Sequence, residues 1–263
     1  MGCISFWYGR QDLNLHGNPL EPKSNVSANS TTPAFIKLLT GGAPIAPHAR
    51  MPCYSITEKM KSQRSSFSYL LAFSFAYATM GAKGGEDMVF LETERLCLRN
   101  VKPEDTATIY DYRNNDLCAR YQRGQTKDYD GIVTLVEKRK TDVLSTENNC
   151  FVAVADKETD ELIGEIVVMP NDGTISLGYT FSYKHHRKGY AFEVLSALIT
   201  LLHGRYPGWD FISFTDRENA ASRALLTKLG YKDMGYISKM DSQVYGKYTT
   251  AETDAEIAQA AEK

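Results

Sequence analysis

The stretch that decides the fold reads Leu177-Gly-Tyr-Thr-Phe-Ser-Tyr-Lys-His-His-Arg-Lys-Gly-Tyr-Ala191. Here a β-rich segment ends, a short basic loop follows, and a helix is expected to begin at Gly189. The first N–H groups of a helix have no partner within it, and the helix dipole favours an anion there. Gly189 allows close approach to the main chain, and Arg187 and Lys188 add positive charge. This pattern is typical of a pyrophosphate-binding turn; an ordinary strand-to-helix turn with a solvated basic loop is an equal alternative.

On both sides of this stretch, hydrophobic periodicity predicts alternating strands and helices. Strands are expected at residues 95–99, 151–155, 162–169, 174–181, 211–214, 236–240 and 244–248. Helices are expected at residues 103–114, 132–144, 189–204 and 219–229. The resulting order, β-α-α-β-β-β-α-β-α-β-β, indicates a mixed α/β domain around one twisted sheet.

The overall composition suits a soluble globular domain and excludes several classes of partner. Hydrophobic residues make up 43% of the 263 residues and the formal net charge is -2, so no strong field draws the chain to nucleic acid or to anionic lipid. The five cysteines form no CxxC pair, which argues against a disulfide framework or a zinc site. The adjacent His185 and His186 have no third ligand nearby in the sequence. We therefore expect no metal, no nucleic-acid partner and no membrane partner.

Two further segments extend the pattern. One is Glu218-Asn-Ala-Ala-Ser-Arg-Ala-Leu-Leu-Thr-Lys-Leu-Gly-Tyr231, and the other is Glu94-Arg-Leu-Cys-Leu-Arg99 followed by Pro103-Glu-Asp105. In their order and spacing with Gly178-Tyr179 and Lys188-Gly189-Tyr190-Ala191, they resemble the GNAT acetyltransferase superfamily. The branch that contains the ribosomal-protein N-terminal acetyltransferases is the most similar. The resemblance covers residues 90–248 and implies a single twisted, mostly antiparallel sheet flanked by helices.

The resemblance implies acetyl-CoA as co-substrate and assigns its binding residues. The last residues of the strand that precedes the loop would offer main-chain groups to the pantetheine arm and to the acetyl carbonyl; these are Tyr179, Thr180 and Phe181. The loop, the helix start and a later asparagine would hold the rest of the cofactor; these are His186, Arg187, Lys188, Gly189, Tyr190, Ala191 and Asn219. Arg187 stands where the family has a glycine, so its side chain is expected either to strain the turn or to contact a phosphate.

The resemblance also implies the chemistry, which is direct attack of a primary amine on the thioester in a ternary complex. Ser222 stands where this branch has a serine near the cofactor sulfur, and it could donate a hydrogen bond to the departing thiolate. Glu165 is the candidate general base, although it could equally be a solvent-facing strand residue. Many relatives have a tyrosine at the position of Leu226 and a glutamate at the position of Ser176. The acceptor would be a peptide N-terminus or a small amine, framed by residues Tyr110, Tyr112, Arg113, Tyr121, Gln122 and Arg123.

Other interpretations stay open for several of these residues. Asn219 is also a good cap for the helix that follows it, and Ser222 could be an ordinary residue of the first helical turn. The departures at Ser176 and Arg187 favour, as a second hypothesis, a non-catalytic acyl-CoA-binding or regulatory module on the same fold. The oligomeric state is expected to be a monomer or a homodimer.

The sequence divides into three parts. Residues 1–87 show no sustained periodicity, and residues 9–33 resemble the product of a mistakenly translated transfer-RNA gene, so we interpret this part as an irregular extension with Met88 as the natural start. A rival interpretation is a secretory signal at residues 60–81, where Lys61 and Arg64 precede an apolar run. Residues 88–248 form the expected acetyltransferase domain, and residues 249–263 a polar tail that is frayed or disordered. Because acetyl-CoA is a cytosolic metabolite, we expect a cytoplasmic protein.

Overall fold

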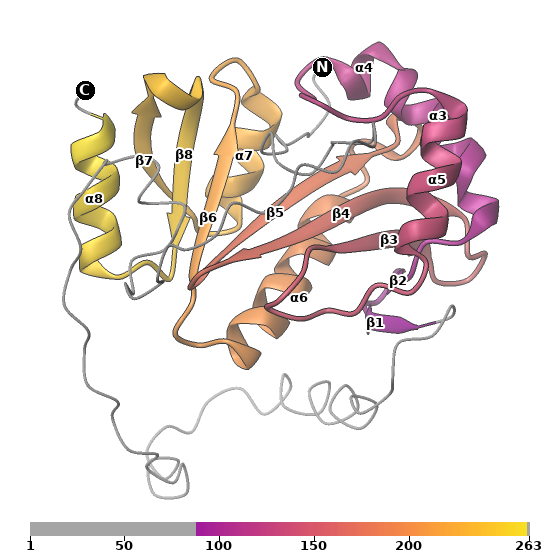
Figure 1. Cartoon of the computed structure of the whole chain (residues 1–263), viewed down its shortest axis with the longest axis horizontal. Coiled ribbons are helices and arrows are strands. Elements are labelled where there is room, and N and C mark those ends of the chain that lie inside the picture. The colour runs from indigo at the N-terminus through magenta and orange to yellow at the C-terminus, as the bar shows by residue number, and fades with distance from the viewer. Residues whose placement is uncertain (1–87, 262–263) are drawn as a thin grey trace, which may run out of the picture.

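A computed structural model describes residues 88–261 of the chain (Figure 1). The predictions for residues 1–87, namely a mis-assigned start and a secretory signal, lie outside the described residues. Within them, no helix is long and apolar enough to cross a membrane.

The described residues form one eight-stranded sheet with the order β1-β2-β3-β4-β5-β6-β8-β7. The strands are β1 Val89–Glu92, β2 Leu96–Arg99, β3 Cys150–Asp156, β4 Leu162–Asn171, β5 Thr174–Phe181, β6 Asp210–Thr215, β7 Lys232–Ile237 and β8 Ser242–Lys247. All neighbouring strands are antiparallel except β5 and β6, which are parallel. This arrangement confirms the predicted mixed α/β fold with a mostly antiparallel sheet.

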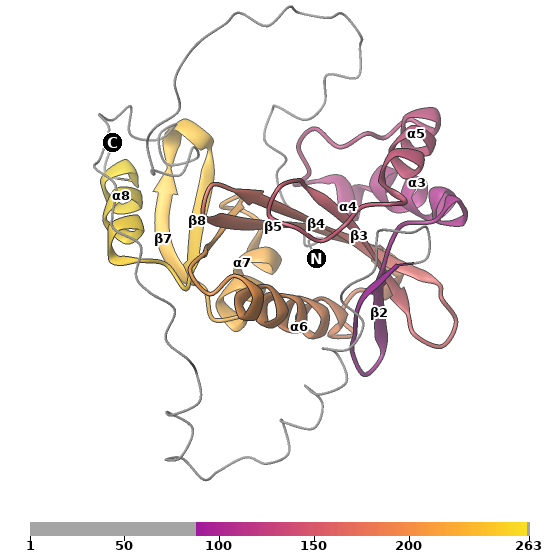
Figure 2. The same ribbon diagram turned by 60° about the horizontal axis from the view of Figure 1, so that its bottom comes forward.

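Helices cover both faces of the sheet (Figure 2). They are α3 Thr106–Asn114, α4 Asp116–Ala119, α5 Tyr129–Arg139, α6 Tyr190–Arg205, α7 Ala220–Lys228 and α8 Ala251–Ala261, with short 3-10 turns η2 Pro103–Asp105, η3 Tyr183–His185 and η4 Ser238–Met240. Side chains of β3 alternate between the two faces: Val152 belongs to the core that includes residues of α6, whereas Phe151 belongs to the core that includes residues of α3 and α5. This is the period-two pattern of a strand covered on both sides.

The polar tail contains a packed helix. Helix α8 lies against β7, and its Ile257 is only 1% exposed, among Ile212, Phe214 and Val244 of the sheet. The ordered domain therefore extends beyond residue 248. Helix α5 also begins earlier than expected, at Tyr129, because the side chain of Asp128 accepts a hydrogen bond from the Gly131 N–H and caps the helix.

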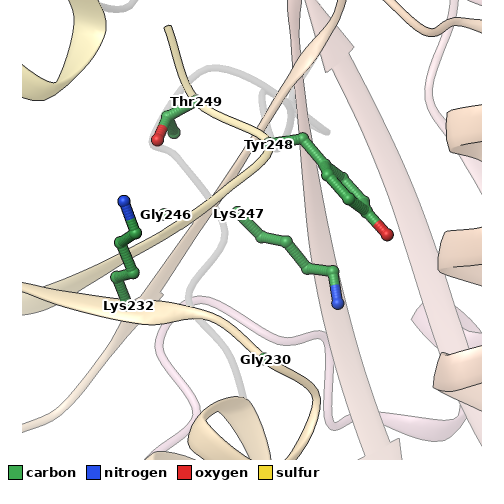
Figure 3. A pocket seen from close by; sticks show the side chains of 6 residues that line it. All are labelled: Gly230, Lys232, Gly246, Lys247, Tyr248 and Thr249. Atoms are coloured by element: carbon green, nitrogen blue, oxygen red, sulfur yellow. The ribbon is translucent and has the colours of Figure 1, made fainter. Parts of the chain in front are cut away.

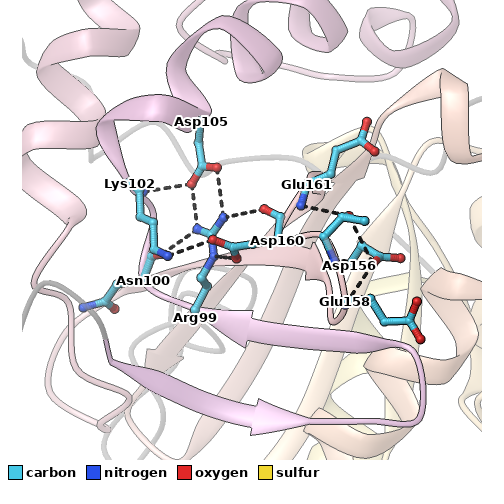
Figure 4. A network of polar contacts seen from close by, with 9 residues as sticks. Arg99, Asn100, Lys102, Asp105, Asp156, Glu158, Asp160 and Glu161 are labelled. Carbon is cyan, nitrogen blue, oxygen red and sulfur yellow. Dashed lines mark hydrogen bonds and ion pairs between the residues drawn. The ribbon is translucent and has the colours of Figure 1, made fainter.

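A buried arginine joins the first strands to the helical layer (Figure 4). Arg99 is 4% exposed, and its guanidinium pairs with Asp105 at 2.8 Å and with Asp160 at 2.6 Å. Lys102 contacts the second oxygen of Asp160 at 2.8 Å. A buried charge is tolerated only when it is paired and hydrogen-bonded, so this network fixes β2, η2 and the β3–β4 turn relative to one another.

Candidate functional site

Strands β5 and β6 diverge soon after they meet (Figure 1). They pair only through Thr174 with Asp210 and Ile175 with Phe211, whereas β5 pairs with β4 along its whole length, up to Phe181 with Gly164. From residue 176 onward, the edge of β5 that faces β6 therefore lacks a partner strand. An unpaired edge offers main-chain N–H and C=O groups to a ligand in extended conformation.

The basic loop that follows β5 ends at the start of α6, as predicted. Gly189 is the N-cap of α6, with a left-handed φ of 83°. Among the residues that the structure describes, the main-chain N–H groups from Arg187 to Phe192 donate to no acceptor; Glu193 N–H is the first to bond back, to the Gly189 carbonyl at 3.1 Å. These free donors lie beside the exposed side chains of Arg187 and Lys188, and such an arrangement at a helix start favours an anion.

Arg187 occupies a left-handed conformation, with φ of 66°. A non-glycine residue in this region costs about 1–2 kcal/mol, so the expected strain at the position of the family glycine is present. The side chain is exposed. It therefore lies free to contact an anion as well.

Arg95 completes the surroundings of this turn, and no sequence pattern indicated it. Its guanidinium contacts Glu193 at 2.6 Å, donates to the Lys188 carbonyl at 3.2 Å and lies 4.6 Å from the centre of the Tyr190 ring. Partial burial acts to raise the pKa of Glu193, but hydrogen bonds from Thr93 and Arg95 outweigh it and lower the pKa. Glu193 therefore stays ionised, and the positive charge of Arg95 balances it, so that it opposes an anion at the helix start less strongly.

His186 turns back toward β5. Its Nε2 lies 2.9 Å from the Phe181 carbonyl oxygen, and the thiol of buried Cys118 lies 3.3 Å from the same oxygen. A hydrogen bond with Cys118, followed by the bond to the Phe181 carbonyl, raises the pKa of His186 against the effect of burial. The histidine therefore ties the loop to the end of β5.

Asn219 and Ser222 lie at the start of α7. The Asn219 side chain accepts the Ser222 N–H at 3.1 Å, which confirms the predicted helix cap. The Ser222 hydroxyl lies 3.1 Å from the Tyr179 hydroxyl of β5, and both residues are buried. Burial raises the pKa of Tyr179, so its phenol stays protonated. The sequence identified the main chain of Tyr179 but missed this side-chain contact.

Glu165 is not a solvent-facing strand residue, because it is 1% exposed. One carboxylate oxygen accepts from Arg113 Nη2 at 2.6 Å and Gln125 Nε2 at 3.1 Å, and the other from the Tyr112 hydroxyl at 2.5 Å and Arg113 Nε at 3.2 Å. A carboxylate has about four acceptor positions. All of them are filled here.

The segment between α4 and α5, residues 120–128, which we term the bridging segment, contacts both sides of the β5–β6 opening. On the β5 side, Gln122 and Gln125 both donate to the Thr180 hydroxyl, at 2.5 and 3.1 Å. On the β6 side, Arg123 contacts Asp216 at 3.2 Å and Asp241 at 2.9 Å. Of the residues expected to frame the acceptor, Gln122 and Arg123 thus contact the two sides of the opening, whereas Tyr112 and Arg113 bind Glu165. Tyr110 packs against Tyr129 instead.

The described residues contain no group of three or more His, Cys, Asp or Glu side chains that could hold a metal ion. Cys150 is buried, and burial raises the pKa of its thiol, so it is poorly suited to nucleophilic attack.

The unpaired edge of β5 lies beside an open helix start, and these are the two elements to which the sequence resemblance assigned the binding of acetyl-CoA. The family model described as "Acetyltransferase (GNAT) domain" matches residues 95–232. The chain therefore belongs to the GNAT acetyltransferase family.

Individual proteins agree with this assignment. Over 167 residues the chain is 27% identical to the uncharacterized N-acetyltransferase YoaA of Bacillus subtilis (strain 168), which covers 61% of this chain and 92% of that protein. A GNAT acetyltransferase from Bacillus anthracis is 21% identical, with a TM-score of 0.52 over 60% of this chain and 96% of its own. The ribosomal-protein alpha-N-acetyltransferase RimL, solved in complex with coenzyme A, is 12% identical, with a TM-score of 0.53 over 61% and 97%. The solved structures share the fold, and RimL comes from the branch that the sequence resembles.

Proposed function

We propose that this protein transfers an acetyl group from acetyl-CoA to a primary amine, either a peptide N-terminus or a small-molecule amine, by direct attack in a ternary complex. The observation that carries the proposal is the row of free main-chain N–H groups from Arg187 to Phe192. They lie at the positive end of the 16-residue helix α6, where a diphosphate is favoured. Because acetyl-CoA is a cytosolic metabolite, we propose that the reaction takes place in the cytoplasm. The protein would act as a monomer or a homodimer.

The loop and helix start would hold the diphosphate. Lys188 and Arg187 supply positive charge, Gly189 leaves the main chain open, and Tyr190 and Ala191 contribute N–H groups. Among the described residues, and apart from its chain neighbours, only Arg95 Nη2, at 3.7 Å, lies within 4 Å of a Cβ built on Gly189, so the space next to its Cα is open. His186 contributes by fixing the loop to β5 rather than through a free side chain.

The open edge of β5 would align the thioester. Main-chain groups of Tyr179 are the candidates for holding the pantetheine arm and the carbonyl oxygen as it becomes negative. Thr180 was expected to contribute as well, but its main-chain groups point toward β4, where it pairs with Glu165, because these groups alternate between the two edges of a strand. At Phe181 only the N–H is a candidate, since His186 and Cys118 already lie against the carbonyl. Asn219 keeps the start of α7 in place beside this edge.

The reaction needs one new bond and one broken bond. The neutral amine nitrogen attacks the acetyl carbon and the carbon–sulfur bond breaks. The nitrogen loses one proton to solvent, and the thiolate takes up one proton. Ser222, backed by the Tyr179 hydroxyl, is the proposed donor to the sulfur. Glu165 enters the proposal as a positioning residue, because its filled acceptor positions leave no lone pair for the amine proton; through Gln125 it holds the Thr180 hydroxyl.

Binding and turnover test the proposal separately. Calorimetric titration with acetyl-CoA should show binding to the wild type and to Gly208→Asp, a loop glycine with open space around it. Gly189→Asp should lose binding by at least about tenfold, since it adds a negative charge and a strained φ at the anion site. Release of free coenzyme A thiol should then identify the acceptor from peptide N-termini, amino acids, polyamines and aminoglycosides. Equal affinity of the two variants would refute the diphosphate site.

A non-catalytic acyl-CoA-binding module is the second candidate, and the saturated Glu165 favours it. In that case the wild type would bind acetyl-CoA with the same sensitivity to Gly189→Asp. No amine in the panel would accelerate thiol release above the rate of hydrolysis.

A further inference from the structure

Strands β5 and β6 meet at only two residue pairs, and the C-terminal part of the chain contacts both residues that β6 contributes. These residues are Asp210 and Phe211. The contacts come from residues 248–253, which lead from β8 into the first turn of α8 and which we term the C-terminal tie. Its first two residues, Tyr248 and Thr249, line the pocket in Figure 3, where their side chains point away from each other.

Asp210 is held by the start of α8. Its side chain is 6% exposed; one carboxylate oxygen accepts the Thr250 N–H at 3.2 Å, and the other accepts the Thr253 hydroxyl. The Asp210 N–H donates in turn to the Gly173 carbonyl at 2.9 Å, in the turn that precedes β5. A buried carboxylate is stable only when its oxygens are hydrogen-bonded. Asp210 therefore connects α8 to the point where β5 and β6 meet.

Phe211 is contacted by Tyr248. The two rings meet edge to face at 5.7 Å, and the Tyr248 ring also stacks on His203 of α6 at 3.7 Å. Tyr248 has a left-handed φ of 58°, which residues other than glycine rarely adopt. Such a conformation persists only where the surrounding structure holds it. Tyr248 therefore links the second paired residue of β6 to α6.

The pairing of β5 with β6 has little strength of its own. Two parallel residue pairs supply few hydrogen bonds, and parallel pairing is slightly less stable per residue than antiparallel pairing. Beyond Ile175 the two strands diverge, so the orientation of β6 at Asp210 and Phe211 sets the width of the opening beside β5. The tie contacts both of these residues, and it therefore restrains β6 where the two pairs alone would not.

We propose that the C-terminal tie sets the width of the β5–β6 opening, and that Thr253 is a positioning residue for the acetyl-CoA bound there. Thr253 is 5% exposed and acts through Asp210. When the tie is weakened, a smaller fraction of molecules has the binding-competent opening, and the apparent Kd rises by the inverse of that fraction. The proposal rests on the proposed function for the identity of the ligand.

Amide hydrogen exchange tests the tie without any ligand. Thr253→Val removes the hydroxyl but keeps the branched shape, whereas Thr253→Ser keeps the hydroxyl. In the full-length protein, exchange of the Asp210 N–H, followed by NMR, should become at least about tenfold faster in Thr253→Val, while amides of the β3–β4 pair stay within about twofold of the wild type. Thr253→Ser should restore wild-type exchange. Thr134→Val is the control, because Thr134 is exposed and its hydroxyl bonds within α5.

Calorimetric titration tests the consequence for binding. The Kd of acetyl-CoA should rise about fivefold in Thr253→Val and keep its wild-type value in Thr253→Ser and Thr134→Val. The Kd of ADP, which has the diphosphate but no pantetheine arm, should stay within about twofold in all variants, because the turn at residues 187–192 is not changed. A merely structural role would lower the Tm without separating the two ligands. Tyr248→Ala removes the contact with Phe211 and should produce the same separation.

Unchanged exchange of the Asp210 N–H in Thr253→Val overturns the proposal, and so does faster exchange with an unchanged Kd of acetyl-CoA. Equal weakening of acetyl-CoA and ADP also overturns it, because the effect would then not be confined to the opening. A wild type that binds no acetyl-CoA refutes the proposed function and the role of Thr253 in binding; the exchange rates then still decide whether the tie holds β6 to β5.

Discussion

The hydroxyl of Tyr179 lies 3.1 Å from the hydroxyl of Ser222, which joins the open strand β5 to the start of α7. The two residues are 43 positions apart in the sequence, and both are buried in the core beneath the β5–β6 opening. In the family, many members carry a tyrosine acid at the position of Leu226. Here a tyrosine from a different element, β5, reaches Ser222 of the same helix instead.

Tyr179→Phe tests whether this phenol supports proton donation through Ser222. We expect kcat for acetyl transfer to fall about tenfold, which is less than the roughly hundredfold or more that a direct proton donor contributes, because Tyr179 acts through Ser222. The Kd of acetyl-CoA should change little. Tyr231→Phe is the control, because Tyr231 is also a buried tyrosine but is not hydrogen-bonded to Ser222. Equal kcat values for the two variants would show that the Tyr179 hydroxyl has only a structural role.

Arg113→Met tests how much the ion pair between Arg113 and Glu165 contributes to the stability of the fold. Removing one partner leaves a buried charge without compensation, so the free energy of unfolding should fall by about 3–5 kcal/mol. Arg120→Met provides the comparison, because Arg120 and Glu218 are 65% and 77% exposed and 3.9 Å apart; its effect should stay below about 1 kcal/mol. Urea denaturation measures both. A small decrease in the free energy of unfolding for Arg113→Met would mean that the ion pair between Arg113 and Glu165 is not formed in solution.

Local sequence patterns predicted strand β5 and the turn that ends at Gly189. They could not predict which distant residues pair with one another. Strand β5 has the expected bounds because Asn171-Asp-Gly173 precedes it and the basic loop follows. The start of α6 at Gly189 could be predicted from the sequence, because the left-handed conformation of this glycine depends on the local turn and not on a contact with a distant residue. Glu165 and Arg113 are 52 positions apart, and Arg95 and Glu193 are 98 apart. Their pairing is created by the sheet order, which periodicity does not encode. Helix α8 was missed because Ile257 is its only large apolar residue.

Arg123→Met tests the bridging segment. Loss of the contacts to Asp216 and Asp241 should free the segment from the β6 side of the opening. We expect the KM of the acceptor amine to rise several-fold, because the acceptor would be held less well in position. The Kd of acetyl-CoA should stay within about twofold, because the turn at residues 187–192 is not changed. Steady-state kinetics with each substrate varied in turn distinguishes the two. A parallel loss of acetyl-CoA binding would mean that the segment supports the donor site instead.

Glu193→Gln should show a stability difference that depends on pH. The folded-state pKa of Glu193 lies below its ordinary value of 4.5, so its contribution is present above that value and is lost as the pH falls through the folded-state pKa. At pH 7 the variant should be less stable than the wild type by up to about 1 kcal/mol, given the partial exposure of the pair with Arg95. Thermal denaturation from pH 7 to pH 3 measures the difference. A difference that persists unchanged at pH 3 would exclude ionisation of Glu193 as its cause.

Arg187→Gly separates backbone strain from charge at the turn. Replacing a left-handed residue by glycine relieves about 1–2 kcal/mol of strain, against which the greater freedom of glycine in the unfolded chain costs about 0.5–1 kcal/mol. Stability should therefore rise slightly, while the Kd of acetyl-CoA rises several-fold because a cation beside the diphosphate is removed. Asp172→Gly is the control, since Asp172 is exposed and also has a positive φ, of 40°, in the β4–β5 turn. It should change stability in the same direction and leave acetyl-CoA binding alone. Unchanged affinity in Arg187→Gly would mean that the main-chain donors bind the diphosphate without help from this side chain.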